Sequence, residues 1–176
     1  MSKNSLPRTE RQKQSSARVK RLYDQFQPER YELAITPAGG TVTIRGKKIG
    51  RPSQRLTFHQ KDLKIKSARI IYHGKNGDEE VEIERINRQQ SFDEVRLHSK
   101  IMLYPGSYTV SLDFESKNDG SIPSTMEKYI GSDKPFIPAQ LGNKTARKFF
   151  PCIDEPEAAS MLMIESNPHK TIEYKS

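Results

Sequence analysis

The stretch Leu103-Tyr-Pro-Gly-Ser-Tyr-Thr-Val-Ser-Leu-Asp-Phe114 decides the fold of this 176-residue chain. Its second half alternates large apolar residues with polar ones from Tyr108 to Phe114. Successive side chains of a β-strand point to opposite faces, so this period of two predicts a strand with one face in a core. Pro105-Gly106 comes just before it and predicts a turn, because proline fixes φ and glycine accepts positive φ.

Seven further segments carry the same alternation or a short apolar run, and each predicts a short strand. Gly74-Lys-Asn-Gly77 contains an Asn-Gly pair, which accepts positive φ and predicts a tight hairpin. About eight or more short strands without internal helices predict an all-β fold, an antiparallel, saddle-like β-sandwich. The seven segments span residues 31–35, 42–44, 56–58, 68–72, 81–86, 92–104 and 161–164.

The first 25 residues differ from the rest of the chain because they are strongly basic. Seven lysines and arginines against two acids give this stretch +5 of the total charge of +8. Val19, Leu22, Tyr23 and Phe26 have the spacing of an amphipathic stripe, which predicts a short helix over about 12–26. The expected organisation is a basic tail over 1–25, partly disordered or helical, followed by one β-domain over 26–176.

Such a basic arm either binds an acidic partner or is a solvated terminus. Aromatic residues are not interleaved with the basic ones, which disfavours nucleic acid as a partner. The hydrophobic fraction of 33% and the mean hydropathy of −0.83 are low for a self-contained domain. Two explanations stay open: a small core that leans on neighbours, or an ordinary β-domain diluted by a polar tail.

The location of the protein is expected to be cytoplasmic. Cys152 is the only cysteine of the chain, so no internal disulfide can form. No apolar run approaches the roughly 18 residues of a membrane span, and no apolar stretch follows the basic N-terminus as in a secretory signal. No membrane is therefore expected as a partner.

The sequence contains no motif for catalysis or metal binding. It has no Gly-x-Ser-x-Gly elbow, no glycine-rich phosphate loop and no cysteine pair at metal-ligand spacing. The apolar setting of Cys152 predicts a buried, unreactive thiol. The four histidines are His59, His73, His98 and His169. No histidine is followed by glutamate, and no two are four residues apart. We therefore expect no catalytic residues and no metal-ligating residues in this chain.

The segment Ala146-Arg-Lys-Phe-Phe-Pro-Cys-Ile-Asp-Glu-Pro156 resembles a block, close to Ala-Arg-Arg-Ala-Phe-Pro-Cys-Phe-Asp-Glu-Pro, of the zinc aminopeptidases related to aminopeptidase N. In these gluzincin metallopeptidases the block belongs to the N-terminal β-domain. Four upstream segments resemble strands of the same domain in the same order, so the resemblance covers about 26–166. These segments are residues 26–35, 41–46, 59–65 and 103–114.

The resemblance implies a non-catalytic domain of a hydrolase that removes N-terminal residues from peptides. The family's catalytic domain carries His-Glu-x-x-His and a zinc ion, so zinc is expected there and no cofactor in this chain, which is expected to be inactive alone. The implied partners are that catalytic domain and, in the full enzyme, the peptide substrate. The implied role is to scaffold the catalytic domain and shape the first substrate pocket. The alternative is a free-standing β-sandwich that contacts a partner through its basic tail or an exposed loop.

Just before this block the family carries a Gln-x-Glu or Gln-x-Gln pair that helps to hold the free amine of the substrate. The resemblance places Gln140 on the first member and Gly142 on the second, so both are candidate substrate-binding residues. Glycine offers no carboxylate to an ammonium group, which is a departure from the family. The block itself is expected to be a rigid structural turn in which Arg147 pairs with a nearby carboxylate; its candidate residues are Arg147, Pro151, Cys152, Asp154, Glu155 and Pro156.

Overall fold

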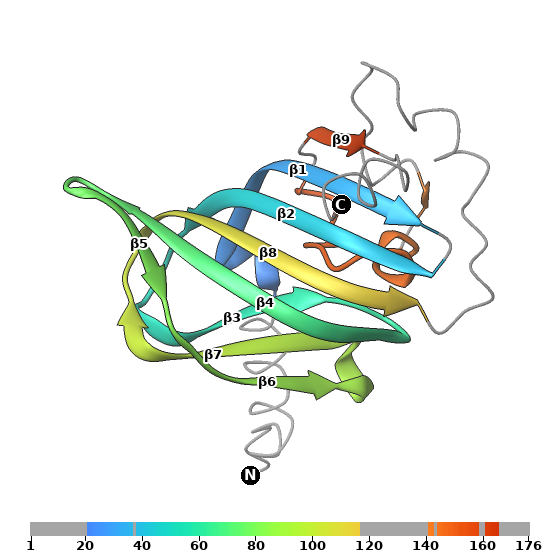
Figure 1. Ribbon diagram of the computed structural model, residues 1–176, viewed down its shortest axis with the longest axis horizontal. Helices are drawn as coiled ribbons and strands as arrows, with labels where there is room; N and C mark the ends of the chain where they lie inside the picture. The colour runs from blue at the N-terminus through green and yellow to red at the C-terminus, as the bar shows by residue number, and fades with distance from the viewer. Residues whose placement is uncertain (1–20, 37, 117–140, 143, 159–160, 166–176) are drawn as a thin grey trace, which may run out of the picture.

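The computed structural model describes residues 21–36, 38–116, 141–142, 144–158 and 161–165, which form two β-sheets packed face to face (Figure 1). The larger sheet has six strands in the order β5-β4-β8-β2-β1-β9, and the smaller has three in the order β3-β7-β6. The strands are β1 (Phe26–Thr36), β2 (Gly39–Lys48), β3 (Ser53–His59), β4 (Leu63–Gly74), β5 (Gly77–Val81), β6 (Ile83–Gln89), β7 (Glu94–Leu103), β8 (Gly106–Ser116) and β9 (Met161–Glu165).

The predicted all-β sandwich is confirmed. Neighbouring strands pair antiparallel, except that β9 runs parallel to β1. Short 3-10 turns are the helical elements of the described residues: η1 (Leu22–Asp24), η2 (Gln90–Phe92) and η4 (Ala146–Lys148). Among the described residues, no helix has the length and apolarity needed to cross a bilayer.

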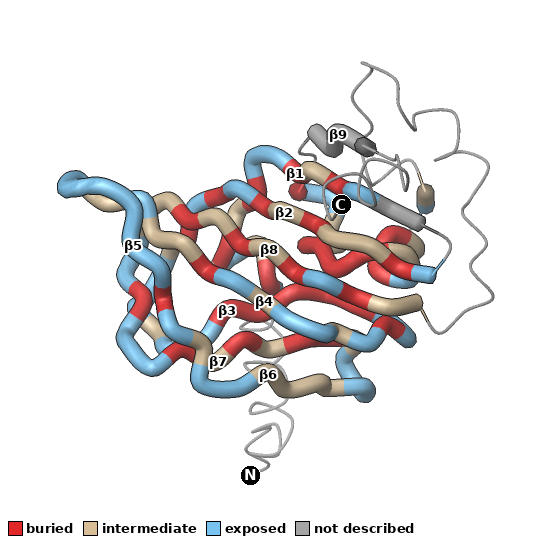
Figure 2. The backbone as a smooth tube through the Cα atoms, viewed as in Figure 1, coloured by how far each residue is buried: buried red, intermediate tan, exposed pale blue. Residues whose placement is uncertain are grey.

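The core lies between the sheets and follows the alternation of the strands. Val110 and Leu112 of β8 are fully buried, whereas Asp113 between Leu112 and Phe114 is exposed. Figure 2 shows this alternation of buried and exposed positions along β8 and its neighbours. Phe26 and Phe58 meet edge to face across the core with ring centroids 5.5 Å apart. Burying each such side chain stabilises the fold by roughly 1.5–3 kcal/mol.

The apolar run expected as one strand over 81–86 is two strands in different sheets, which corrects that prediction. Val81 at the end of β5 pairs with Ile70 in the larger sheet. Ile83 begins β6 and pairs with Ser99 in the smaller sheet. Glu82 lies between them, and its carbonyl accepts a hydrogen bond from the backbone of Lys100 at 3.1 Å. The chain therefore crosses from one sheet to the other here, and the two sheets share a corner.

The predicted N-terminal helix also needs correction at its described end. Leu22 belongs to the 3-10 turn η1, and Phe26 already starts strand β1. Both side chains are buried, so the apolar spacing reflects docking at the edge of the sandwich rather than a helical stripe. Phe92, expected within a strand, lies in η2 and is 45% exposed. Residues 1–20, which hold most of the basic tail and of the expected helix, and residues 117–140 lie outside the described residues.

Candidate functional site

The segment that carries the Phe-Pro-Cys-x-Asp-Glu-Pro block lies at the end of the sandwich away from the β4–β5 hairpin (Figure 1). It is attached to β3 by an antiparallel bridge between His59 and Cys152. The backbone of His59 donates to the carbonyl of Cys152 at 2.7 Å, and Cys152 donates back at 3.1 Å. This segment follows the candidate substrate-binding residues in the chain, and one of these, Gly142, is itself described.

Arg147 is the central cation of this segment and is only 6% exposed. Its Nε donates to Oδ2 of Asp154 at 2.9 Å, and its backbone N–H donates to the same oxygen at 3.3 Å. A second guanidinium nitrogen donates to the carbonyl of Asp154, also at 3.3 Å. The third lies 3.5 Å from Oδ2 of Asp93, in the turn that follows η2. One guanidinium thus ties the block to itself and to the smaller sheet.

Glu155, the carboxylate next to Asp154, pairs with a different group. Its Oε1 accepts a hydrogen bond from the backbone N–H of Tyr23 at 2.7 Å, which fixes η1 to the block. Pro156 beside it is exposed. Glu157 pairs with Arg21, the first described residue. The acidic end of the block therefore holds the start of the domain in place.

His59 is buried beside Arg147 and is held in a neutral state. Its Nδ1 accepts a hydrogen bond from the backbone N–H of Asp154 at 3.0 Å. Burial, with smaller contributions from the charges of Arg147 and Lys144, lowers the pKa of His59 from 6.5 to about 3. The imidazole therefore has one nitrogen committed as an acceptor, and this arrangement makes it a structural group rather than a general base.

Cys152 and its neighbours are packed into the core. Burial, first, and then the charge of Asp154 raise the pKa of the Cys152 thiol well above its usual range, so it stays protonated. The hydroxyl of Tyr31 in β1 accepts a hydrogen bond from the backbone of Ile153 at 3.0 Å. Phe150 packs edge to face on the Tyr31 ring, with centroids 6.1 Å apart. Pro151 is buried as well.

The segment 146–156, β3 and the turn at Asp93 meet in a junction around Arg147. Several residues of this junction were not predicted from the sequence. Gln60 is 1% exposed, and its Oε1 accepts a hydrogen bond from the backbone of Leu63 at 3.1 Å. Its backbone N–H donates to the carbonyl of Asp93 at 2.8 Å. Asp93 adopts a left-handed backbone with φ of 52°, a conformation that Asp tolerates better than most residues. Their roles depend on contacts between segments far apart in the chain.

Of the two candidate substrate-binding residues, Gln140 lies outside the described residues. Gly142 is described; it is exposed and has a positive φ of 100°. Its carbonyl accepts a hydrogen bond from Thr145 at 3.4 Å, which starts the turn into η4. A side chain at this φ would be strained, so the backbone alone gives a reason for glycine at this position.

The polar side chains of the junction form structural contacts within the protein. These guanidinium, imidazole and carboxylate groups are paired with one another or with backbone groups. Among the described residues, no three His, Cys, Asp or Glu side chains are grouped so that they could hold a metal ion. The described part of the chain therefore does not fit the ligand set of a zinc site.

Comparison with known proteins gives a consistent match. The family model described as Peptidase M1 N-terminal domain matches residues 27–171. Aminopeptidase N of Lactobacillus helveticus is 28% identical over 155 residues, which cover 83% of this chain and 17% of that protein. Aminopeptidase N of Lactococcus lactis subsp. cremoris is 30% identical over 146 residues, or 80% of this chain and 16% of the relative. Glutamyl aminopeptidase of Sus scrofa is 26% identical over 171 residues, which cover 89% of this chain and 17% of that protein.

The chain thus spans about a sixth of the length of the curated relatives that it matches. The matched range ends beyond the Phe-Pro-Cys-x-Asp-Glu-Pro block and includes all nine strands except the first residue of β1.

Proposed function

Because this chain belongs to the Peptidase M1 N-terminal domain family, we propose that it acts as the non-catalytic N-terminal β-domain of a zinc aminopeptidase. In this role it scaffolds a catalytic domain and shapes the first substrate pocket. The zinc ion and the glutamate base belong to that catalytic domain, and the substrate is a peptide with a free N-terminus. The observation that carries the proposal is the family match over 27–171, together with the buried hydrogen-bonded junction around Arg147. This junction holds in place the segment that directly follows Gly142.

The proposal is tested by exchanging domains. The N-terminal domain of one of the matched aminopeptidases is replaced by this chain, and kcat/KM is measured with aminoacyl substrates. We expect zinc-dependent turnover well above that of the same enzyme with its N-terminal domain deleted. If the exchanged enzyme folds and binds zinc but is no more active than the deleted one, the scaffolding role is wrong.

The isolated chain is predicted to bind no stoichiometric zinc and to hydrolyse no aminoacyl substrate. The reason is that its sequence has no His-Glu-x-x-His and that its described residues form no group of ligands. Elemental analysis after dialysis against a chelator, followed by a turnover assay with added zinc, checks both points. Stoichiometric zinc together with turnover would refute the prediction.

Gln140 is proposed to contact the substrate amine, and its removal is expected to weaken binding in the domain-exchanged enzyme. Gln140→Ala should raise KM by the equivalent of one hydrogen bond, roughly 0.5–1.5 kcal/mol, with kcat changed less. Gln90→Ala is the matched control, because Gln90 is an exposed glutamine in η2. Equal KM values for the Gln140 variant and the unmodified enzyme would remove Gln140 from the site.

Gly142 is proposed to line the same pocket without a side chain. Substituting Glu to restore the family's carboxylate would act on a backbone with φ of 100°, so a fall in stability is expected along with any gain in binding. The KM of a Gly142→Glu variant therefore has to be compared at matched folded fractions. This separates the effect of the carboxylate on the amine from the effect of backbone strain.

For the location of the protein we propose the cytoplasm. The single cysteine of the chain is a buried thiol, which suits a reducing compartment. Fractionation of cells that produce the protein, followed by detection with a specific antibody, tests this. Recovery with a cytosolic marker supports the proposal, and recovery in the exported or membrane fraction contradicts it.

A further inference from the structure

The two sheets part at the end of the sandwich where the β7–β8 and β4–β5 hairpins lie, and they leave a cavity there. Its volume is about 430 Å³, within the range of small-ligand and side-chain pockets. Its walls come from both sheets: Tyr72 and Glu79 from the larger one, and Met102 and Leu103 from the smaller. The junction around Arg147 lies at the other end of the molecule (Figure 1).

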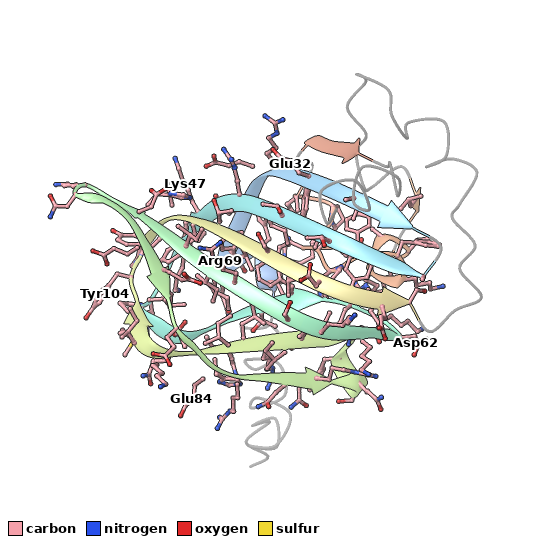
Figure 3. The ribbon with its side chains drawn as sticks, viewed as in Figure 1. Glu32, Lys47, Asp62, Arg69, Glu84 and Tyr104 are labelled. Atoms are coloured by element: carbon pink, nitrogen blue, oxygen red, sulfur yellow. The ribbon has the colours of Figure 1, made fainter. Side chains whose placement is uncertain are left out.

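The rim of this cavity carries three of the four large apolar side chains that are exposed among the described residues. Ile101 is 56% exposed, Met102 44% and Tyr104 61%, and all three line the cavity. Figure 3 shows Tyr104 at the tip of the sandwich, projecting away from the body of the sheets. Contiguous exposed apolar residues at a concave site are typical of an interaction surface.

The aromatic wall of the cavity is held in position. The rings of Tyr72 and Tyr108 lie 5.0 Å apart, and the hydroxyl of Tyr108 donates to the carbonyl of Tyr104 at 2.7 Å. The Tyr72 ring fits between two glycines. A Cβ atom at Gly74 or Gly106 would come within 3.0 Å of a ring carbon of Tyr72. The rings therefore have little freedom to collapse into the opening.

The charge beside this wall is negative, although the whole chain is at +8. Residues 78–84 carry five carboxylates. Glu80 pairs with Arg69 and Glu82 pairs with Lys100, and Asp78 accepts a hydrogen bond from the His73 ring. Glu79 forms no ion pair with any described residue. It lies opposite Tyr72 in the sheet, on the same face of β5 as the buried Val81, so its carboxylate belongs to the cavity side.

We propose that this cavity binds a lysine or arginine side chain of a partner peptide in which apolar residues flank the basic one. The cation would lie against the tyrosine rings, whose faces attract positive charge, with Glu79 as its counter-ion. The flanking apolar residues would cover Ile101, Met102 and Tyr104. An acidic segment would be repelled by the carboxylates of 78–84, and a purely apolar one would bury Glu79 without a partner. This site lies at the opposite end of the molecule from the segment that carries the Phe-Pro-Cys-x-Asp-Glu-Pro block (Figure 1).

The methyl group of Met102 reports on the cavity directly. The full chain is labelled with ¹³C at its methionine methyl groups, and the Met102 signal is assigned with Met102→Leu. Acetyl-Leu-Arg-Leu-amide is then titrated against acetyl-Leu-Gln-Leu-amide. We expect a saturable shift of the Met102 signal, with the arginine peptide bound about five-fold more tightly than the glutamine peptide.

Two variants make the test specific. Glu79→Gln should weaken binding of the arginine peptide about five-fold and remove its advantage over the glutamine peptide. Glu84→Gln, at an exposed carboxylate of the same acidic run that does not line the cavity, should leave both affinities unchanged. Equal affinity for the two peptides, no Met102 shift, or a Glu79→Gln variant that binds as the unmodified chain does would each overturn the proposal. A Met102 shift that depends on protein concentration alone would also overturn it, because a second copy would then be the occupant.

Discussion

Replacing Arg147 with alanine is expected to destabilise the domain by roughly 3–5 kcal/mol, because it leaves a buried carboxylate without its partner. The side chains of Arg147 and Asp154 are 7% and 8% exposed, so the guanidinium and not bulk water compensates the carboxylate in the folded chain. The substitution also removes the contact to Asp93 and the bond to the carbonyl of Asp154. Urea denaturation at about pH 7 measures the loss as a change in the free energy of unfolding.

The neighbouring residue provides the control. Lys148 is exposed in the same 3-10 turn, so Lys148→Ala should change stability by no more than about 0.5 kcal/mol. Arg147→Lys keeps the charge but cannot direct donors to two residues at once, and it should recover only part of the loss. If Arg147→Ala unfolds at the same urea concentration as the unmodified chain, the buried pair does not hold the block.

Acidification is expected to destabilise the protein through His59 before most carboxylates titrate. The pKa of His59 is about 3 in the folded state against 6.5 ordinarily. Well above pH 6.5 the imidazole is neutral in both the folded and the unfolded state, and its contribution to stability is complete. Between these two values the unfolded histidine takes up a proton that the folded one cannot, so the free energy of unfolding falls by about 1.4 kcal/mol per pH unit.

The contribution of His59 is isolated by comparing pH dependences. The free energy of unfolding is measured from about pH 7 to about pH 4 for the unmodified chain and for His59→Gln. As the pH falls, the free energy of unfolding of the variant should decrease less steeply than that of the unmodified chain. The difference in slope should correspond to close to one bound proton, whatever the stability of the variant at neutral pH. His73→Gln, at an exposed histidine that pairs with Asp78, is the matched control. Parallel curves for the unmodified chain and His59→Gln would show that His59 is not held neutral.

The strands were predictable because their signal is local. From Tyr108 to Phe114 the alternation alone identifies the buried face, and the burial of Val110 and Leu112 follows it. The division of 81–86 into β5 and β6 was not predictable in this way. Alternation tells which face of a strand is buried, but the choice of sheet depends on partners such as Ile70 and Ser99, which the sequence pattern does not name.

The junction around Arg147 was predictable only in part, for the same reason. Asp154 lies seven residues from Arg147, so the pair could be considered from the sequence. Asp93 lies 54 residues away, and His59 lies 95 residues from its partner Asp154. Phe26 shows the opposite failure, because its spacing from Leu22 suits a helix whereas tertiary packing places it in β1. In each case a non-local contact decided the outcome.

The most direct test of the account is whether this chain associates, as a separate polypeptide, with an M1 aminopeptidase that lacks its own N-terminal domain. Sedimentation analysis of the mixture measures complex formation, and the enzyme's own N-terminal domain, added in the same way, is the positive control. We expect a one-to-one complex that restores zinc-dependent hydrolysis. A positive control that binds, alongside a folded chain that sediments alone and restores nothing, would contradict it.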